Sequence, residues 1–247
     1  MTEDAFLGGR LTIRQPARGF RSGHEAVLLA ASIPAVGRAH ALEAGLGAGV
    51  ASLCLLARVP GVSATGLEAH GDMAALAAAN AHSNGLADRL EVVVGMIEAP
   101  PEGLRRRSFD HVFANPPFLE AGEGAAAPDE MRALARLGPE GTLKAWVDFC
   151  VRRTASGGTV TLLHRADRLD RMLEALGGRC GAVHVFPLWP KAGQPAKRVL
   201  LRAIKGARAP LTLLPGLVLH AADGRYGEEA EAVLRTGAPL AALTCVS

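Results

Sequence analysis

Asn115-Pro116-Pro117-Phe118 is the stretch whose residue types point most directly to chemistry. The Asn115 amide offers an acceptor and two donors, and the Pro116 carbonyl adds a second acceptor. Each proline restricts the residue before it to extended conformations, so Asn115 is held rigidly. Phe118 supplies a flat apolar face. This set suits a planar substrate that carries an amino group, such as a nucleobase. The alternative is a strand that simply ends in an Asn-Pro turn.

A second stretch, Glu43-Ala44-Gly45-Leu46-Gly47-Ala48-Gly49, is a glycine-rich loop that follows an acid. Glycines permit a tight turn and a close approach of the backbone to a ligand. Dinucleotide-binding loops place their third glycine one residue later, so the alternate spacing here is different. Glu68 follows 25 residues after Glu43, where a carboxylate can accept two hydrogen bonds from ribose hydroxyls.

Alternating helical and strand patterns must position these residues. Apolar and glycine-bounded runs predict seven strands, with helices between most of them. The expected strands are residues 40–44, 61–68, 90–94, 109–114, 158–164, 182–186 and 198–204. The expected helices are residues 23–32, 50–58, 71–83, 139–154 and 166–176, the first with Ser22 as its cap. Such alternation predicts an α/β fold with a seven-stranded, mostly parallel sheet, whose last two strands form a C-terminal antiparallel hairpin.

Length and composition predict one large domain with a sizeable core. The 247 residues are divided into an N-terminal segment and first helix (1–35), a Rossmann-like core (36–204) and a C-terminal extension (205–247). Four scattered cysteines without metal-site spacing favour a reduced, cytoplasmic protein without zinc. No apolar stretch is long enough to span a bilayer, so no membrane partner is expected. The sequence leaves the oligomeric state open.

Three segments are less regular. Residues 1–21 are expected to be loop-like, and residues 119–138 either a lid beside the site or a disordered surface loop. Residues 164–210 hold ten Lys or Arg against three Asp or Glu, which indicates either contact with RNA phosphates or a solvated face. The candidate RNA-binding residues are Trp189, which is either a stacking platform or a core residue, with Lys191, Lys197 and Arg198. The basic cluster also includes Arg165, Arg168, Arg202 and Lys205.

The remaining conspicuous side chains are interpreted as structural. His164, His184 and His220 lie in or near expected strands. Arg105-Arg106-Arg107 precedes the strand of residues 109–114, so it belongs at the opposite edge of the sheet, where a solvated turn is expected.

The chain resembles the class I S-adenosylmethionine-dependent methyltransferases, some of which carry Asn-Pro-Pro-Phe after the fourth strand and act on exocyclic amines. More specifically, residues 15–29, 109–118 and 187–199 resemble the bacterial tRNA (adenine-N(6)-) methyltransferases, which modify the adenine beside the anticodon of a valine tRNA. The resemblance extends through most of residues 10–236. It implies S-adenosyl-L-methionine as cofactor and an RNA, specifically a tRNA, as partner.

The resemblance also implies roles for individual residues. Asn115, Pro116, Pro117 and Phe118 would form the catalytic tetrapeptide, in which Asn115 and Pro116 bind the amine and Phe118 stacks on the base. The cofactor would be covered by Arg21, Ser22, Gly23 and His24. Its methionine part would be held by Glu43, Gly45, Gly47 and Gly49, and its ribose by Glu68. The other two cofactor-binding residues would be Met96 and Asn115. No metal ligands are implied.

Two positions depart from the family pattern. Leu46 stands where the family often has Cys, and Met96 stands where an Asp usually binds the adenine amine of the cofactor. An apolar Met can pack on the adenine ring, but it cannot accept that hydrogen bond.

Other functions remain open at this point. Methyltransferases for guanine-N(2) of ribosomal RNA or for a protein glutamine amide use the same tetrapeptide. A non-catalytic RNA-binding or cofactor-sensing module is an alternative raised by Met96. A nicotinamide oxidoreductase is a third class, in which Asn-Pro-Pro-Phe has no role.

Overall fold

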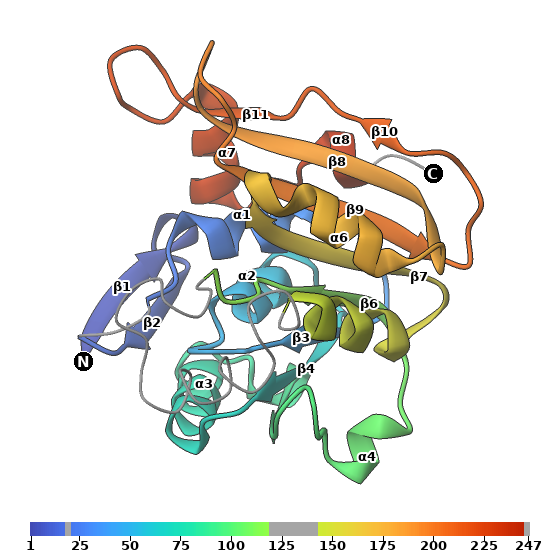
Figure 1. Ribbon diagram of the computed structural model, residues 1–247. Coiled ribbons are helices and arrows are strands. Elements are labelled where there is room, and N and C mark those ends of the chain that lie inside the picture. The colour runs from blue at the N-terminus through green and yellow to red at the C-terminus, as the bar shows by residue number, and fades with distance from the viewer. Residues whose placement is uncertain (18–20, 119–142, 245–247) are drawn as a thin grey trace.

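The computed structural model describes residues 1–17, 21–118 and 143–244 (Figure 1). The strands are β1 (Thr2–Phe6), β2 (Leu11–Gln15), β3 (His40–Ala44), β4 (Ser63–Glu68), β5 (Leu90–Val94), β6 (Phe109–Ala114), β7 (Thr154–Arg165), β8 (Cys180–Lys191), β9 (Arg198–Lys205), β10 (Thr212–Leu213) and β11 (Leu217–His220). The helices are α1 (His24–Ser32), α2 (Val50–Arg58), α3 (Gly71–Ser83), α4 (Glu102–Arg105), residues 143–153, α6 (Leu169–Leu176), α7 (Glu228–Thr236) and α8 (Ala241–Thr244).

One nine-stranded sheet forms the centre of the protein, in the order β10-β8-β9-β7-β6-β3-β4-β5, with β11 also paired to β8. Strands β3, β4, β5, β6 and β7 are parallel to one another, whereas β9 is antiparallel to both β7 and β8. All seven expected strands are therefore present, and the antiparallel hairpin is β8–β9. The C-terminal extension adds β10 and β11, which pair with β8 in parallel.

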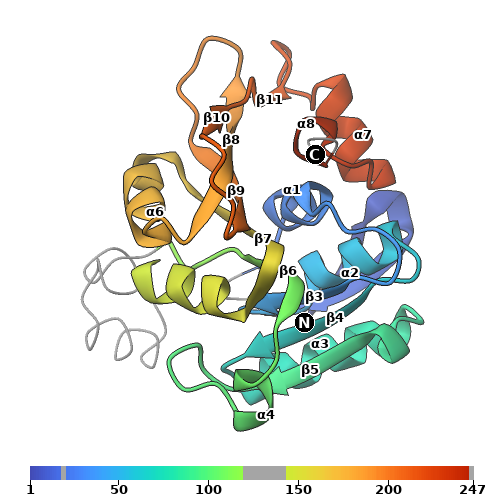
Figure 2. The same ribbon diagram turned by 90° about the vertical axis from the view of Figure 1, so that its right-hand side faces the viewer.

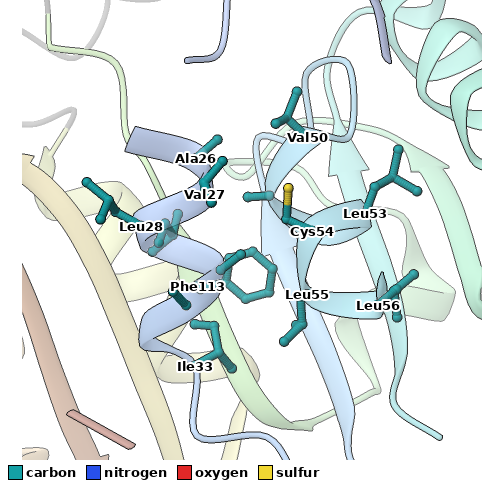
Figure 3. Packing of buried hydrophobic residues seen from close by; sticks show 14 of the residues in the cluster. Ala26, Val27, Leu28, Ile33, Val50, Leu53, Cys54, Leu55, Leu56 and Phe113 are labelled. Atoms are coloured by element: carbon teal, nitrogen blue, oxygen red, sulfur yellow. The ribbon is translucent and has the colours of Figure 1, made fainter. Parts of the chain in front are cut away.

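Helices cover both faces of the sheet (Figure 2). One apolar cluster joins α1, α2, α3 and α7 to the first face, and the other joins α4, α6 and the helix of residues 143–153 to the second. Figure 3 shows how α1 and α2 pack together beside Phe113 of β6, which is fully buried between them and the sheet. This core fixes β6, and therefore the tetrapeptide that follows it.

Three local expectations are wrong. Residues 1–21 are not all loop, because β1 and β2 form an antiparallel hairpin. Ser22 does not cap α1, whose N-cap is Gly23 without a side-chain hydrogen bond. Strand β8 is longer than expected, since residues 187–191 continue it. The expected lid of residues 119–138 lies outside the described residues.

Candidate active site

The carboxyl ends of β3 and β6 form the centre of the site. These neighbouring strands are parallel, and the chain leaves β3 toward β4 and β5 but leaves β6 toward β7, on the other side. Loops at such a reversal of strand order diverge and leave a crevice for a ligand. The glycine-rich loop follows β3 and Asn-Pro-Pro-Phe follows β6, so the topology brings together the two stretches that the sequence singled out.

The glycine-rich loop has a backbone that favours glycine. Gly45, Gly47 and Gly49 have φ values of 76°, 55° and 86°, in the left-handed region. A Cβ on Gly45 would lie 2.7 Å from the Trp146 ring, whereas a Cβ on Gly47 would meet nothing within 4 Å. The Gly45 N–H donates to the Leu67 carbonyl of β4 at 2.9 Å. The loop is therefore fixed against β4 and leaves open space at Gly47.

Leu46, between these glycines, is a core residue. It is buried, and a Cβ on Gly66 of β4 would lie only 2.5 Å from its methyl groups. An apolar residue is therefore well accommodated at this departure from the family pattern.

Glu43 is buried at the base of the loop and is directed toward the start of α2. Its Oε2 accepts hydrogen bonds from the Ser52 N–H at 2.9 Å and from Ser52 Oγ at 2.5 Å. Burial raises the pKa of Glu43 to about 8, even though both Ser52 hydrogen bonds act to lower it. Glu43 therefore links β3 to α2, and an ammonium group brought near it would favour its charged form.

Glu68, at the end of β4, reaches the same loop. Its Oε2 accepts from the Gly47 N–H at 2.8 Å, and its Oε1 accepts from the His70 N–H at 3.0 Å. A carboxylate has further lone pairs, so both oxygens can still accept hydroxyl donors. Next to it, Val94 and Met96 at the end of β5 are 55% and 45% exposed and provide an apolar surface.

Asn115 carries the most distinctive feature of the site. Its Oδ1 is buried and has no hydrogen-bond partner in the part of the chain that the structure describes. A buried acceptor without a partner is costly, so its retention at a site indicates a ligand donor. Asn115 lines a cleft of about 210 Å³, and the rest of the lining comes from residues 21–26. Arg21, Ser22, Gly23 and His24 therefore line one cleft together with Asn115.

The β1–β2 hairpin anchors this segment, a role that sequence reasoning missed. The buried Gln15 side chain accepts from the Ser22 N–H at 2.9 Å and donates to the Ser22 carbonyl at 3.1 Å. It also donates to Asp4, which receives two hydrogen bonds from Arg21 at 2.7 and 2.8 Å. Burial acts to raise the pKa of Asp4, but the hydrogen bonds from Arg21 and Gln15 outweigh it and lower the pKa.

Phe118 is held in a small cluster. The Arg198 guanidinium lies 4.4 Å from the centre of its ring, and the His164 ring meets it edge-on at 5.1 Å. Arg198 also donates to Glu25 of α1 at 2.8 Å. Burial lowers the pKa of His164 to about 4, although the Pro117 carbonyl acts to raise it, so the imidazole is neutral at physiological pH. His164 therefore packs against the tetrapeptide, and Arg198 covers part of Phe118.

The expected RNA-binding residues have different surroundings. Lys191, Lys197 and Arg198 lie at the site edge of the sheet, at the end of β8 and the start of β9. Trp189 is half-buried, and its indole N–H donates to the Pro215 carbonyl at 3.0 Å.

Two members of the wider basic cluster are not available for phosphate at this edge. Arg202 is buried against His184 and the Leu243 carbonyl. Lys205 donates to the Thr154 carbonyl at the opposite edge of the sheet.

Comparisons with known proteins agree with this geometry. Residues 41–138 match the model of a methyltransferase domain family. A protein from Aeromonas hydrophila named tRNA1(Val) (adenine(37)-N6)-methyltransferase is 29% identical over 83% of this chain and 85% of its own. One of the same name from Shewanella baltica is 25% identical over 88% of this chain and 91% of its own. A solved structure, a predicted O-methyltransferase from Agrobacterium tumefaciens, has a TM-score of 0.72 at 24% identity, over 87% of this chain and 96% of that one.

The chain has the Rossmann-like fold of class I methyltransferases and is an S-adenosylmethionine-dependent methyltransferase. Three features of this methyltransferase follow one another along one edge of the sheet: the open loop at Gly47, the Glu68 carboxylate, and the apolar surface of Val94 and Met96. Their chemistry suits, in that order, the methionine part, the ribose and the adenine of S-adenosylmethionine. No helix among the described residues is long and apolar enough to cross a membrane.

Proposed function

We propose that the methyltransferase methylates the exocyclic N6 of adenine in a tRNA, at the position named for its relatives, adenine 37 of a valine tRNA. The observation that carries this proposal is the buried, unpartnered Oδ1 of Asn115 in the Asn-Pro-Pro-Phe tetrapeptide. An adenine amine has two N–H groups, and one of them would satisfy this acceptor. A tRNA substrate would also place the protein in the cytoplasm.

The residues of the site would act on the amine by orientation. The lone pair of an adenine amine is delocalised into the ring. Asn115 Oδ1 and the Pro116 carbonyl would accept hydrogen bonds from its two N–H groups. These bonds would favour a more tetrahedral nitrogen, with its lone pair directed at the methyl group. Bound S-adenosylmethionine supplies an electrophilic methyl group on a sulfonium whose positive charge disappears on transfer. The nitrogen gains the methyl group and then loses one proton to solvent, so alignment and oriented dipoles suffice without a strong base.

The cofactor would be held by the residues around the glycine-rich loop. Gly45, Gly47 and Gly49 allow the methionine part to approach the backbone, and Glu43 lies directly beneath them. Glu68 would accept the ribose hydroxyls. The exposed Met96 would pack against the adenine ring in place of the usual hydrogen bond.

Residues 21–24 would close the cleft over the cofactor. They line it together with Asn115, and the contacts of Arg21 with Asp4 and of Ser22 with Gln15 fix their position. A cofactor enclosed in this way is shielded from water beside the amine acceptor.

A nucleoside digest tests the proposal. The purified protein is incubated with tritiated S-adenosylmethionine and total tRNA that lacks the modification, and the RNA is digested to nucleosides. We expect tritium in N6-methyladenosine from a valine tRNA. Tritium in methylguanosine or in protein would assign the enzyme to another substrate class. No heat of cofactor binding in calorimetry would instead indicate a non-catalytic module.

A further inference from the structure

Three aromatic side chains, from His24, His220 and Tyr226, form a cluster at the site edge of the sheet. The Tyr226 and His220 rings are stacked, with centres 4.8 Å apart and planes 21° apart. The His24 ring meets Tyr226 edge-on, at 6.3 Å and 63°. Tyr226 is the only tyrosine in the chain.

Strand register places this cluster in one row with the active site. Arg165 at the end of β7 pairs with Arg198 at the start of β9, and Leu188 of β8 pairs with the same Arg198. His220 at the end of β11 then pairs with Lys191 at the end of β8. The end of β11 is therefore at the edge that also carries Asn115, and His24 belongs both to the cluster and to the cleft lining.

The cluster is rigid and is open on one side. His220 and Tyr226 form an antiparallel bridge, and the Gly227 N–H donates to the Leu219 carbonyl at 2.9 Å. His220 covers one face of Tyr226, yet Tyr226 remains 37% exposed. The exposed part of Tyr226 can therefore take a planar group without any rearrangement of residues 220–226.

The charges around the cluster favour a base here and phosphates beside it. Asp223 is paired with Arg225, and Glu228 and Glu229 follow at the start of α7, so anions would be repelled close to Tyr226. Lys191 is beside His220 in the sheet register, Lys197 precedes the neighbouring strand β9 at the same edge, and neither lysine forms an ion pair among the described residues. An RNA strand that left the cleft along this edge would thus pass cations and end at an aromatic ring.

We propose that the Tyr226–His220 stack is a second base-binding site, which takes an unpaired nucleobase that neighbours the target adenine in the RNA chain. This inference rests on the proposed function. Base–aromatic stacking tolerates any base, so the site would add affinity and hold the strand rather than read sequence. The target adenine would enter the cleft at Asn115 while its neighbour stacks on Tyr226.

Binding of anticodon stem-loop RNA to Tyr226→Ala and Tyr226→Phe variants tests this site. We expect Tyr226→Ala to raise the Kd for RNA about tenfold, within the range for one base–aromatic stack, and Tyr226→Phe to change it less than about twofold. The Kd for S-adenosylmethionine, measured on the same preparations, should stay at the wild-type value because Tyr226 is not among the residues that line the cleft. A rise in both Kd values would indicate that Tyr226 only supports the fold, and would overturn the proposal.

Abasic RNA then identifies the partner of the ring. Stem-loops that lack the base on the 5′ or the 3′ side of the target adenine are compared in wild type and Tyr226→Ala. One of the two abasic RNAs should bind wild type about tenfold more weakly and lose nothing more in Tyr226→Ala. If both abasic RNAs lose as much affinity in Tyr226→Ala as in wild type, the second site is overturned. The proposed function still stands in that case, provided that wild type methylates adenine. Wild type that methylates no adenine would overturn both.

Discussion

At the scale of single residues, Asn115 has a side-chain oxygen that is buried without a partner, which makes a sharp prediction possible. Asn115→Ala should lower kcat roughly 10²–10³-fold, the usual loss for one preorganised polar group at a reacting centre. Its melting temperature should equal or slightly exceed that of wild type, because this oxygen accepts no hydrogen bond from the described residues that the substitution could remove. Turnover and thermal unfolding are measured on the same preparation.

Asn115→Asp is the matched control, since it keeps an acceptor at the same place. It should retain more activity than Asn115→Ala. If Asn115 only forms a turn, the alanine variant would instead melt earlier and show wild-type activity per folded molecule. That result would remove the central residue of the mechanism.

Glu43 links the protonation of the site to stability. Its pKa in the folded protein, about 8, is above the ordinary value of 4.5, so the folded state keeps a proton that the unfolded state releases between these pH values. Wild-type stability should therefore fall as pH rises through this range. Glu43→Gln cannot ionise and keeps an oxygen for Ser52, so its melting temperature should exceed that of wild type by a margin that grows from about pH 5 to about pH 8.

Thermal scans without cofactor, at a series of pH values, measure this margin. Glu43→Ala is the control, because it also removes the acceptor of both Ser52 hydrogen bonds and should melt earlier across the series. Parallel curves for wild type and Glu43→Gln would show that Glu43 is already ionised in the folded protein.

At the scale of elements, the sequence predicts the central strands and helices closely, but it does not predict the strands β1, β2, β10 and β11 near the two ends of the chain. The predicted bounds of β3, β5 and β6 match the structure, because short apolar runs there end at glycine or proline. The hairpin β1–β2 has no such apolar run, since Glu3 and Asp4 stand together in β1 and only Leu11 and Ile13 alternate with polar residues in β2. It is stabilised by contacts from elsewhere, such as the two hydrogen bonds between Asn80 of α3 and the Arg14 backbone.

The same division applies to the site. Motif residues such as Asn115 and Glu68 are recognisable from local spacing. Gln15 and Glu25 act through contacts that only the fold creates, with Ser22 and with Arg198 respectively. Arg202 is the opposite case. Its charge made it a member of the basic cluster in the sequence, but its side chain is buried in the structure.

The hairpin makes a prediction at this scale through Gln15. Gln15→Ala removes both hydrogen bonds that hold the Ser22 backbone and one to Asp4. The segment that closes the cleft would then lose its anchor, so the Kd for S-adenosylmethionine in calorimetry should rise about tenfold, as expected for loss of a few buried hydrogen bonds.

Arg14→Ala is the control on the neighbouring position of β2. Its ion pair with Glu3 is exposed, and such pairs contribute little to stability. Both Kd and melting temperature should stay near wild type. A Gln15→Ala variant that melts earlier but binds cofactor as wild type does would restrict Gln15 to a structural role.

At the scale of the whole molecule, the two edges of the sheet differ in the groups they present. The site edge combines the cleft, the glycine-rich loop and two cations, Lys191 and Lys197, which form no ion pair among the residues that the structure describes. The opposite edge carries Arg106, which is paired with Glu102 on α4. The net charge of +3 conceals this asymmetry, because RNA would meet only the cations of one edge.

Salt dependence of RNA binding tests which edge the RNA meets. Each phosphate contact contributes about 0.7–0.9 to the slope of log Kd against log salt, so Lys197→Ala should lower the slope by about this amount while leaving cofactor binding unchanged. Arg106→Ala removes an equally exposed cation from the far edge and should leave the slope as it is in wild type. Fluorescence anisotropy with a labelled stem-loop across a salt series gives each slope. If Arg106→Ala lowers the slope and Lys197→Ala does not, the RNA approaches from the opposite edge, and the path from the Asn115 cleft past Lys197 toward Tyr226 is wrong.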